Sequence, residues 1–567
     1  MNKLNDLTHF RHLPAEFVTT SLSDVQAFMD SLVAQNIDSE ESLIEMMERY
    51  SDLLRAVYDE HNLRLLHMKI ERYRQEAQDA CIEFKLNYTD PVRSLASVLE
   101  KKYYDSEYRK NLTEGKYSHL DQLIANKYEI SCQKNTPMLK KEQELALEYN
   151  NIGDILDVQT VLSTEPYPQE DSNLLATNRI HRELFWVSQN GTLLVAEQTL
   201  NDLFHKLCIT RNTIAVNAGF ANYRDYRHAE LGRLAYTPDE LISFHTAIEK
   251  EVMPFIEEIY EERVEKYELG SLRPWDIVEN PNVDLLDAIE STDELVAKTV
   301  EVLDKIDPGF AQHLQMISDM CLLDFYGSDD KKHPASSSPL WGSGTGIIHM
   351  VRQWSHLDIS NFIHECGHII HFRAMRDIPL FIYQDAPDEV AELASLSMVL
   401  LSMDHWDIFY PDPADLKIAK RNELERALLT LPLFATLDAF QHWAYTHPEH
   451  SAEERRESYL DISARFSPYV DWSGLEAYQP QGWMDWQVFQ QPFHDVYYSI
   501  AQLGALGVYM NYRKNKEKAL QDFQNFLAAG YSKPVNELYQ IAGIELDFSE
   551  AGLREIINFV KQELAAL

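Results

Sequence analysis

One segment, residues 358–371, constrains the fold of this chain more than any other. Its apolar residues recur at helical spacing and form one stripe: Ile359, Phe362, Ile363, Cys366 and Ile370. Pro379 follows shortly afterwards and marks the end of a helix. His364 and His368 lie four residues apart and off this stripe, so they share another face of the same helix. The segment therefore predicts a helix, capped by Asp358 or Ser360, that buries one side and presents two imidazoles on another.

The two imidazoles and the intervening Glu365 predict a metal site. Neutral imidazoles at this spacing can chelate a zinc ion. Glu365 projects beside them, where its carboxylate could accept a proton from water. The pattern is the HExxH signature of zinc peptidases. Because so short a pattern also arises by chance, the prediction depends on a third ligand.

A second predicted helix, Pro387–Leu401, offers that ligand, and Pro387 suits its first turn. We select Glu392 as the third ligand, and Glu389, three residues earlier on much the same face, is the alternative. Two histidines and one glutamate leave the fourth position of zinc open for water. This arrangement is typical of a catalytic zinc site.

The paired motifs resemble a known family. His364–His371 and Ala391–Ser395, with Glu392 28 residues after His364, resemble the metal-binding segments of the oligoendopeptidase F and thimet oligopeptidase family of zinc metallopeptidases. The resemblance extends over about residues 200–560, through the segments Leu272–Asp276, Asp284–Val296, Asp471–Gly474 and Ile500–Ala505.

The resemblance implies a mainly helical, two-lobed, neurolysin-like zincin fold with a deep central channel and a small β-sheet near the active site. It also implies a zinc-dependent endopeptidase that hydrolyses short peptides. One Zn²⁺ per chain would be held by His364, His368 and Glu392, and Glu365 would be the catalytic base. His371 is either a residue that orients a ligand or an ordinary packing residue, whereas Cys366 is expected in the core.

Residues 333–346 are rich in Ser, Gly and Pro and are expected to form a loop, followed by a strand at Ile347–Val351. In the resembled family a glycine-containing hairpin occupies this position, and its edge strand pairs with the substrate backbone. A mobile surface loop is the alternative interpretation.

His494 and Tyr498 are the remaining candidate catalytic residues. Pro492 can open a helix, on which these two side chains, four residues apart, would share a face and could donate hydrogen bonds to an oxyanion. A polar helix face without a catalytic role is the alternative. The resemblance implies that Tyr498 matches a tyrosine that stabilises the transition state.

The chain departs from the family pattern at accessory positions. Gln487 stands where similar sequences have an active-site histidine, Val399 stands in place of a glutamate, and His494 and Asp495 replace two tyrosines. These changes motivate a second hypothesis, a zinc- and peptide-binding homologue whose peptidase activity is lost or greatly reduced. A helical structural protein with a chance HExxH pattern is a third.

Length and composition set the outer bounds. With 567 residues the chain exceeds one ordinary core. Pro166 and Pro168 indicate a boundary, so we expect an N-terminal helical region at 1–160 and a metallopeptidase region of two lobes at 161–567. The net charge of −40 disfavours nucleic acid as a partner.

The cysteines and the apolar segments suggest where the protein resides. Five scattered cysteines without CxxC spacing suit a reducing compartment. The N-terminus has no signal-peptide pattern, and no apolar stretch has the length of a membrane span. We therefore expect a cytoplasmic protein that does not bind membranes. The sequence specifies no oligomeric state.

Overall fold

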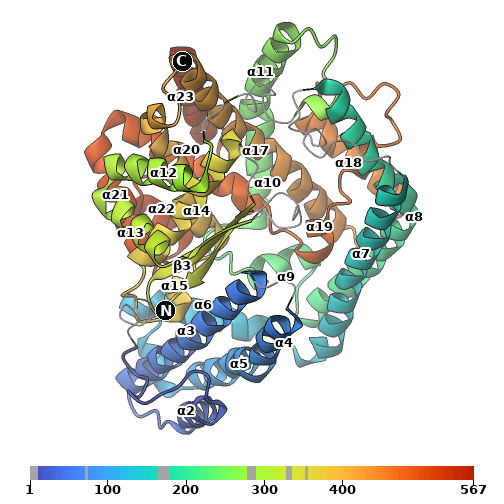
Figure 1. The fold of residues 1–567 in the computed structure, drawn as a ribbon. Coiled ribbons are helices and arrows are strands. Elements are labelled where there is room, and N and C mark those ends of the chain that lie inside the picture. The colour runs from blue at the N-terminus through green and yellow to red at the C-terminus, as the bar shows by residue number, and fades with distance from the viewer. Residues whose placement is uncertain are drawn as a thin grey trace. The chain divides into compact units, whose positions relative to one another are not determined.

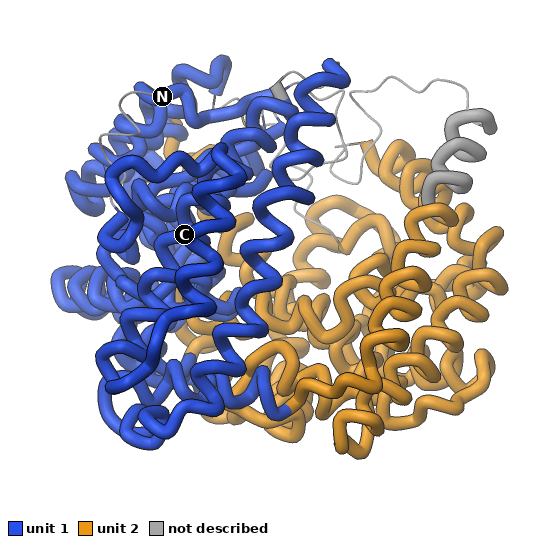
Figure 2. Tube along the Cα trace, turned by 90° about the horizontal axis from the view of Figure 1, so that it is seen from below, with its two compact units in different colours: residues 1–129, 288–411, 507–546 blue, residues 130–287, 412–506, 547–567 orange. Residues whose placement is uncertain are grey.

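The computed structural model describes residues 10–70, 74–163, 178–277, 286, 289–326, 335–351 and 355–567, without the side chains of residues 70 and 153–163. The described chain is mainly helical and carries one small β-sheet, which confirms the predicted fold class (Figure 1). It divides into two compact units, and each is assembled from three separate segments (Figure 2).

Unit 1 comprises Met1–Glu129, Ala288–Pro411 and Gly507–Leu546. Its main helices are α2 (Leu22–Ala34), α3 (Glu40–Ile70), α4 (Gln75–Phe84), α5 (Asp90–Tyr104), α6 (Ser118–Ile130), α12 (Thr292–Ile306), α13 (Pro308–Asp319), α14 (His356–Ala374), α15 (Phe381–Gln384), α16 (Asp388–Ser402), α21 (Lys516–Ala529) and α22 (Val535–Ile541). Helix α2 shows how the sequence sets these elements: the Ser21 side chain accepts a hydrogen bond from the Asp24 amide, and Val25, Phe28 and Leu32 are buried.

The sheet of unit 1 has the order β1-β3-β2, where β1 is Leu323–Tyr326, β2 is Ser336–Leu340 and β3 is Thr345–Val351. Strand β3 pairs with β1 in parallel and with β2 antiparallel. The predicted strand is therefore found. Residues 336–340, which the composition predicted as loop, form β2, and the antiparallel pair of β2 and β3 confirms the glycine-containing hairpin that the family resemblance implied.

Tertiary contacts explain why local loop signals failed here. Ser338 of β2 lies opposite Ile347 of β3. The turn between these strands is held by α3, because the carboxylate of Asp59 accepts hydrogen bonds from the Trp341 amide at 2.5 Å and the Gly342 amide at 2.9 Å. Residues 333 and 334 of the predicted loop lie outside the described residues.

Unit 2 comprises Ile130–Asp287, Asp412–Leu506 and Asp547–Leu567. Its main helices are α7 (Thr136–Ser163), α8 (Arg179–Asn217), α9 (Tyr223–Glu230), α10 (Pro238–Ala247), α11 (Met253–Lys266), α17 (Pro413–Thr446), α18 (Ala452–Phe466), α19 (Trp486–Gln490) and α23 (Glu550–Ala566), and α20 (Val496–Lys514) begins in this unit. Helix α10 starts with a complete capping box. The Thr237 side chain accepts a hydrogen bond from the Glu240 amide, and the Glu240 side chain accepts one from the Thr237 amide.

The predicted boundary near residue 160 falls in this unit, where α7 continues to Ser163. Pro166 and Pro168, which suggested it, lie outside the described residues. The division into regions 1–160 and 161–567 stays a prediction.

Candidate metal site

Helix α14 carries the HExxH pattern on one side and a buried apolar stripe on the other. The stripe is Ile359, Phe362, Ile363, Cys366 and Ile370, all buried, so Cys366 is a core residue. The helix begins at His356 after Ser355, and the predicted caps Asp358 and Ser360 therefore lie inside it. A hydrogen bond of 2.5 Å between the His356 ring and the Tyr410 hydroxyl holds this first turn.

Helix α16 packs closely on α14 because the motif contains Gly367. A Cβ atom at Gly367 would lie 2.6 Å from the Cα of Ser395 and 3.1 Å from the Cβ of Met398. A larger residue would force the two helices apart. Gly367 thus allows the approach that brings Glu392 of α16 to the histidines of α14.

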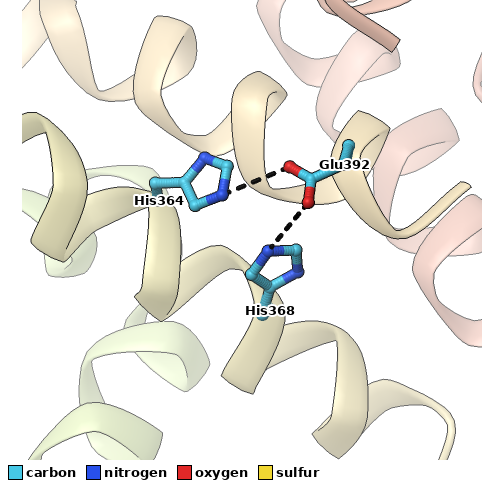
Figure 3. Close-up of side chains that lie close together, drawn as sticks. All are labelled: His364, His368 and Glu392. Carbon is cyan, nitrogen blue, oxygen red and sulfur yellow. Dashed lines mark ion pairs between the residues drawn. The ribbon is translucent and has the colours of Figure 1, made fainter. Parts of the chain in front are cut away.

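His364, His368 and Glu392 converge in unit 1, and Figure 3 shows the two imidazoles of α14 facing the carboxylate of α16. His364 Nε2 lies 3.2 Å from Glu392 Oε2, and His368 Nε2 lies 3.6 Å from Glu392 Oε1. One ligand atom from each residue lies within 4.8 Å of the others. Such a group could hold a metal ion.

The protonation states of these groups suit metal binding. Burial lowers the pKa of His368, so its imidazole is neutral at pH 7 and has a free lone pair. For Glu392, burial favours the neutral acid, but His364, His368 and the Ser395 hydroxyl outweigh it and lower the pKa to about 2. The Ser395 hydroxyl donates to Glu392 Oε2 at 3.1 Å and fixes its orientation. Imidazole nitrogen and carboxylate oxygen are donors that zinc accepts.

Glu365 lies buried on the same helix, with 4% of its surface exposed. Its Oε2 atom has no hydrogen-bond partner among the described residues. A buried carboxylate oxygen without a partner is costly unless a ligand or water satisfies it. This acceptor without a partner, on the helix that bears His364 and His368, fits a site that binds a metal ion and a water molecule.

His371 and Glu389, the two other residues considered for this site, lie outside the group of three ligands. His371 is fully buried and stacks on Phe526, and burial lowers its pKa to about 3. Its structural setting is that of a packed core imidazole. Glu389, the alternative third ligand, is buried on α16 but does not belong to the convergent group.

The structure places His494 and Tyr498 in unit 2 and not on a common helix. Helix α20 begins only at Val496, so the prediction that Pro492 opens a helix shared by both residues is wrong. Phe493 adopts a left-handed φ of 63°, and its amide donates a hydrogen bond to Gln441 Oε1 at 2.8 Å. This backbone conformation prevents a helix from running from Pro492 through His494. His494 contacts the Tyr497 ring edge-on, and Tyr498 stacks on Phe434.

Two further departures from the family pattern, besides His494 and Asp495, are also located. Gln487 is half-buried on the short helix α19, and Val399 is buried in α16. Sequence reasoning overlooked the roles of Gly367 and Ser395. The role of Ser395 could have been predicted from its spacing of three residues from Glu392, because side chains at i and i+3 meet on a helix.

A mainly helical fold with an HExxH helix packed against a glutamate-bearing helix defines a protein of the zincin class. The chain belongs to peptidase family M3, whose family model matches residues 174–557. An oligoendopeptidase F homologue of Borreliella burgdorferi is 23% identical over 248 residues, which cover 43% of this chain and 41% of that relative.

Solved structures share the fold over nearly the whole chain. PZ peptidase A, solved with an inhibitor, superposes with a TM-score of 0.84 at 18% identity and covers 98% of this chain and 99% of its own. A structure from Bacillus anthracis strain Ames, provisionally named oligoendopeptidase F, gives a TM-score of 0.80 at 18% identity and covers 99% of both chains. The family resemblance seen in the sequence is thereby confirmed.

Proposed function

We propose that the protein is a zinc-dependent endopeptidase that hydrolyses short peptides. The observation that carries this proposal is the convergence of three ligand atoms within 4.8 Å, two from α14 and one from α16, together with Glu365 of α14, whose buried Oε2 atom lacks a partner among the described residues. Membership of peptidase family M3 supports it. The central channel and the substrate class derive from the family resemblance.

In this proposal His364, His368 and Glu392 hold one zinc ion. When bound, zinc lowers the pKa of water and polarises the scissile carbonyl. Glu365 accepts a proton from the attacking water and delivers it to the leaving amine, a role for which a buried carboxylate is well placed. Tyr498, with His494, donates hydrogen bonds to the oxyanion.

A zinc- and peptide-binding homologue without efficient turnover is the second candidate. The observation that favours it is the side chain of Gln487, which cannot act as the acid or base that an imidazole provides. Loss of a single oxyanion donor costs about 100- to 1,000-fold in rate. Cleavage would then be slow even with an intact metal group.

A peptide-cleavage experiment tests the proposal. A mixed pool of short peptides would be incubated with zinc-loaded wild type and Glu365→Gln, and the products would be read by mass spectrometry. We expect cleavage by wild type alone, stopped by a chelator, and a loss of about 100- to 10,000-fold in Glu365→Gln. The zinc content of Glu365→Gln would be measured as a control. If the variant retains one zinc ion per chain, its loss of cleavage is caused by the missing base and not by a missing metal. Peptide binding without cleavage by zinc-loaded wild type would favour the second candidate.

We also propose that the protein acts in the cytoplasm, since all five cysteines are free thiols. Among the described helices, none is both long and apolar enough to cross a membrane.

A further inference from the structure

A pocket apart from the metal group lies in unit 1, bounded by α13, α14 and α21. Its volume is about 380 Å³, which suits a small organic ligand. The side chains that matter for its chemistry are Asp307, Phe310, His313, Ile370, Arg373 and Leu527.

This pocket is separate from the metal group although both use α14. Successive residues of an α-helix are rotated by about 100°. Ile370 and Arg373 therefore point to the side of α14 opposite His364 and His368. A ligand in this pocket would not contact the metal ligands.

Arg373 supplies an uncompensated positive charge to the pocket. Its Nη1 atom is buried without a hydrogen bond, and no carboxylate of the described residues forms an ion pair with its guanidinium. Burial and the neighbouring Arg376 lower the pKa of Arg373, and Asp377 opposes them. In a chain with 91 acidic residues, a half-buried guanidinium without an acceptor is unusual. A ligand with a negative charge would compensate it.

The neighbouring polar groups leave this charge in place. His313 is buried, and its burial and the nearby Arg373 lower its pKa to about 4, so it is neutral at pH 7. The Asp307 carboxylate already accepts hydrogen bonds from the Gly309 amide at 2.6 Å and from Gln524 Nε2 at 2.8 Å. Asp307 is therefore engaged by other donors and forms no ion pair with Arg373, whose buried Nη1 atom stays without an acceptor among the described residues.

The rest of the lining is apolar. Phe310, Ile370 and Leu527 are buried core residues that present hydrocarbon to the pocket. Such a wall favours a ligand with an apolar body over a fully hydrated inorganic anion.

We propose that this pocket binds a small carboxylate with a branched apolar chain, of the size of 4-methylpentanoate. The carboxylate pairs with the guanidinium of Arg373, a geometry in which two hydrogen bonds form in parallel. The hydrocarbon packs against Phe310 and Leu527. The proposal does not depend on peptidase activity.

Isothermal titration of the full chain with 4-methylpentanoate tests this site. We expect saturable binding of one ligand per chain, unchanged after zinc is removed with a chelator. Neither 3-methylbutylamine, which lacks the carboxylate, nor inorganic phosphate, which lacks the hydrocarbon, should bind. Arg373→Gln should weaken binding at least tenfold, because the charged hydrogen bonds are lost.

Arg376→Gln is the matched control, since Arg376 lies three residues further along the chain, pairs with Asp377 and does not line this pocket. It should bind like wild type. Equal affinity in folded Arg373→Gln, binding only in the presence of zinc, binding of phosphate instead, or no saturable binding up to about 10 mM would each overturn the proposal. The comparison of the three ligands on wild type holds even if Arg373→Gln fails to fold.

Discussion

Each unit contains a group of two histidines and one carboxylate, and the two groups have opposite characters. The unit 1 group is His364, His368 and Glu392. The unit 2 group is His245 of α10 with Asp438 and His442 of α17. Each uses one pair of side chains four residues apart on a helix, so local spacing alone does not distinguish them.

The difference lies in how the polar atoms are used. In the unit 1 group each oxygen of Glu392 faces a different imidazole, and the His364 and His368 side chains are 19% and 12% exposed. In the unit 2 group one oxygen, Asp438 Oδ2, lies 2.8 Å from His245 Nε2 and 3.3 Å from His442 Nε2, and all three side chains are buried. Within the described part of the chain, only the unit 1 group brings three ligand atoms within 4.8 Å of one another.

This contrast teaches that convergence and access, more than residue type, separate a ligand set from a structural network. Burial favours neutral Asp438, but the two imidazoles outweigh it and hold its pKa well below the usual range. Burial lowers the pKa of His245. In the unit 2 group both imidazoles therefore meet the same buried carboxylate oxygen, whereas in the unit 1 group they meet different oxygens and stay partly exposed, so that an ion can reach them.

The largest expected effect is the loss of zinc from the unit 1 group. Glu392→Gln should weaken zinc binding at least a hundredfold, because even residues that only orient ligands contribute about 10- to 100-fold. Zinc competition with a chromophoric chelator measures it. Glu389→Gln is the control and should keep wild-type affinity. The reverse result would make Glu389 the third ligand.

Asp438→Asn should instead act on stability. Removing the charge that faces two imidazoles in the unit 2 group should lower the free energy of unfolding by about 3 kcal/mol, without changing zinc affinity. Urea denaturation measures the loss, and Asp461→Asn on the exposed face of α18 is the control. If zinc affinity fell as in Glu392→Gln, the distinction between the two groups would fail.

Gly367→Ala tests how the unit 1 group is assembled. The added methyl would meet Ser395 and Met398, so we expect a loss of about 2 kcal/mol in stability together with weaker zinc binding. Gly191→Ala in α8 is the control, since its added methyl meets no atom within 4 Å and should be neutral or stabilising. Unchanged zinc affinity in Gly367→Ala would show that the close approach of α14 and α16 is not required.

The smallest expected effect is a change of stability with pH that is caused by Asp495, a neighbour of the unit 2 group. Burial raises the pKa of Asp495 to about 7, with Asp485 and Asp438 contributing and His494 and Arg233 opposing. As pH rises from about 4 to 7, the unfolded state loses this proton first, so the stability contributed by protonated Asp495 is present below pH 4 and lost towards pH 7.

Asp495→Asn should therefore be more stable than wild type by about 1 kcal/mol at pH 8, and this gain should vanish near pH 4. Urea titrations at both pH values measure it, again with Asp461→Asn as the control. A gain of the same size at both pH values would show that ionisation of Asp495 is not its cause.

Several helices could be predicted from local signals, and the exceptions have physical reasons. The apolar stripe of α14 was sufficient to predict that helix, because helical periodicity acts within a few residues. The composition of residues 336–340 predicted a loop, and only the family resemblance implied the hairpin, because β2 is stabilised by pairing with β3 and by the hydrogen bonds that Asp59 accepts at the turn. The start of α20 was misplaced because Phe493 is held in a left-handed turn by Gln441, 52 residues away.

The sequence by itself determined that one helix presents His364, His368 and Glu365 away from an apolar stripe, since these relations follow from 3.6 residues per turn. Only the tertiary structure decided that Glu392, and not Glu389, reaches the two imidazoles, because this depends on the packing that Gly367 permits between α14 and α16. It also decided that His245 joins Asp438 across 193 residues. Contacts between distant segments leave no periodic signal in the chain, and they separate a metal-type group from a buried network of the same residue types.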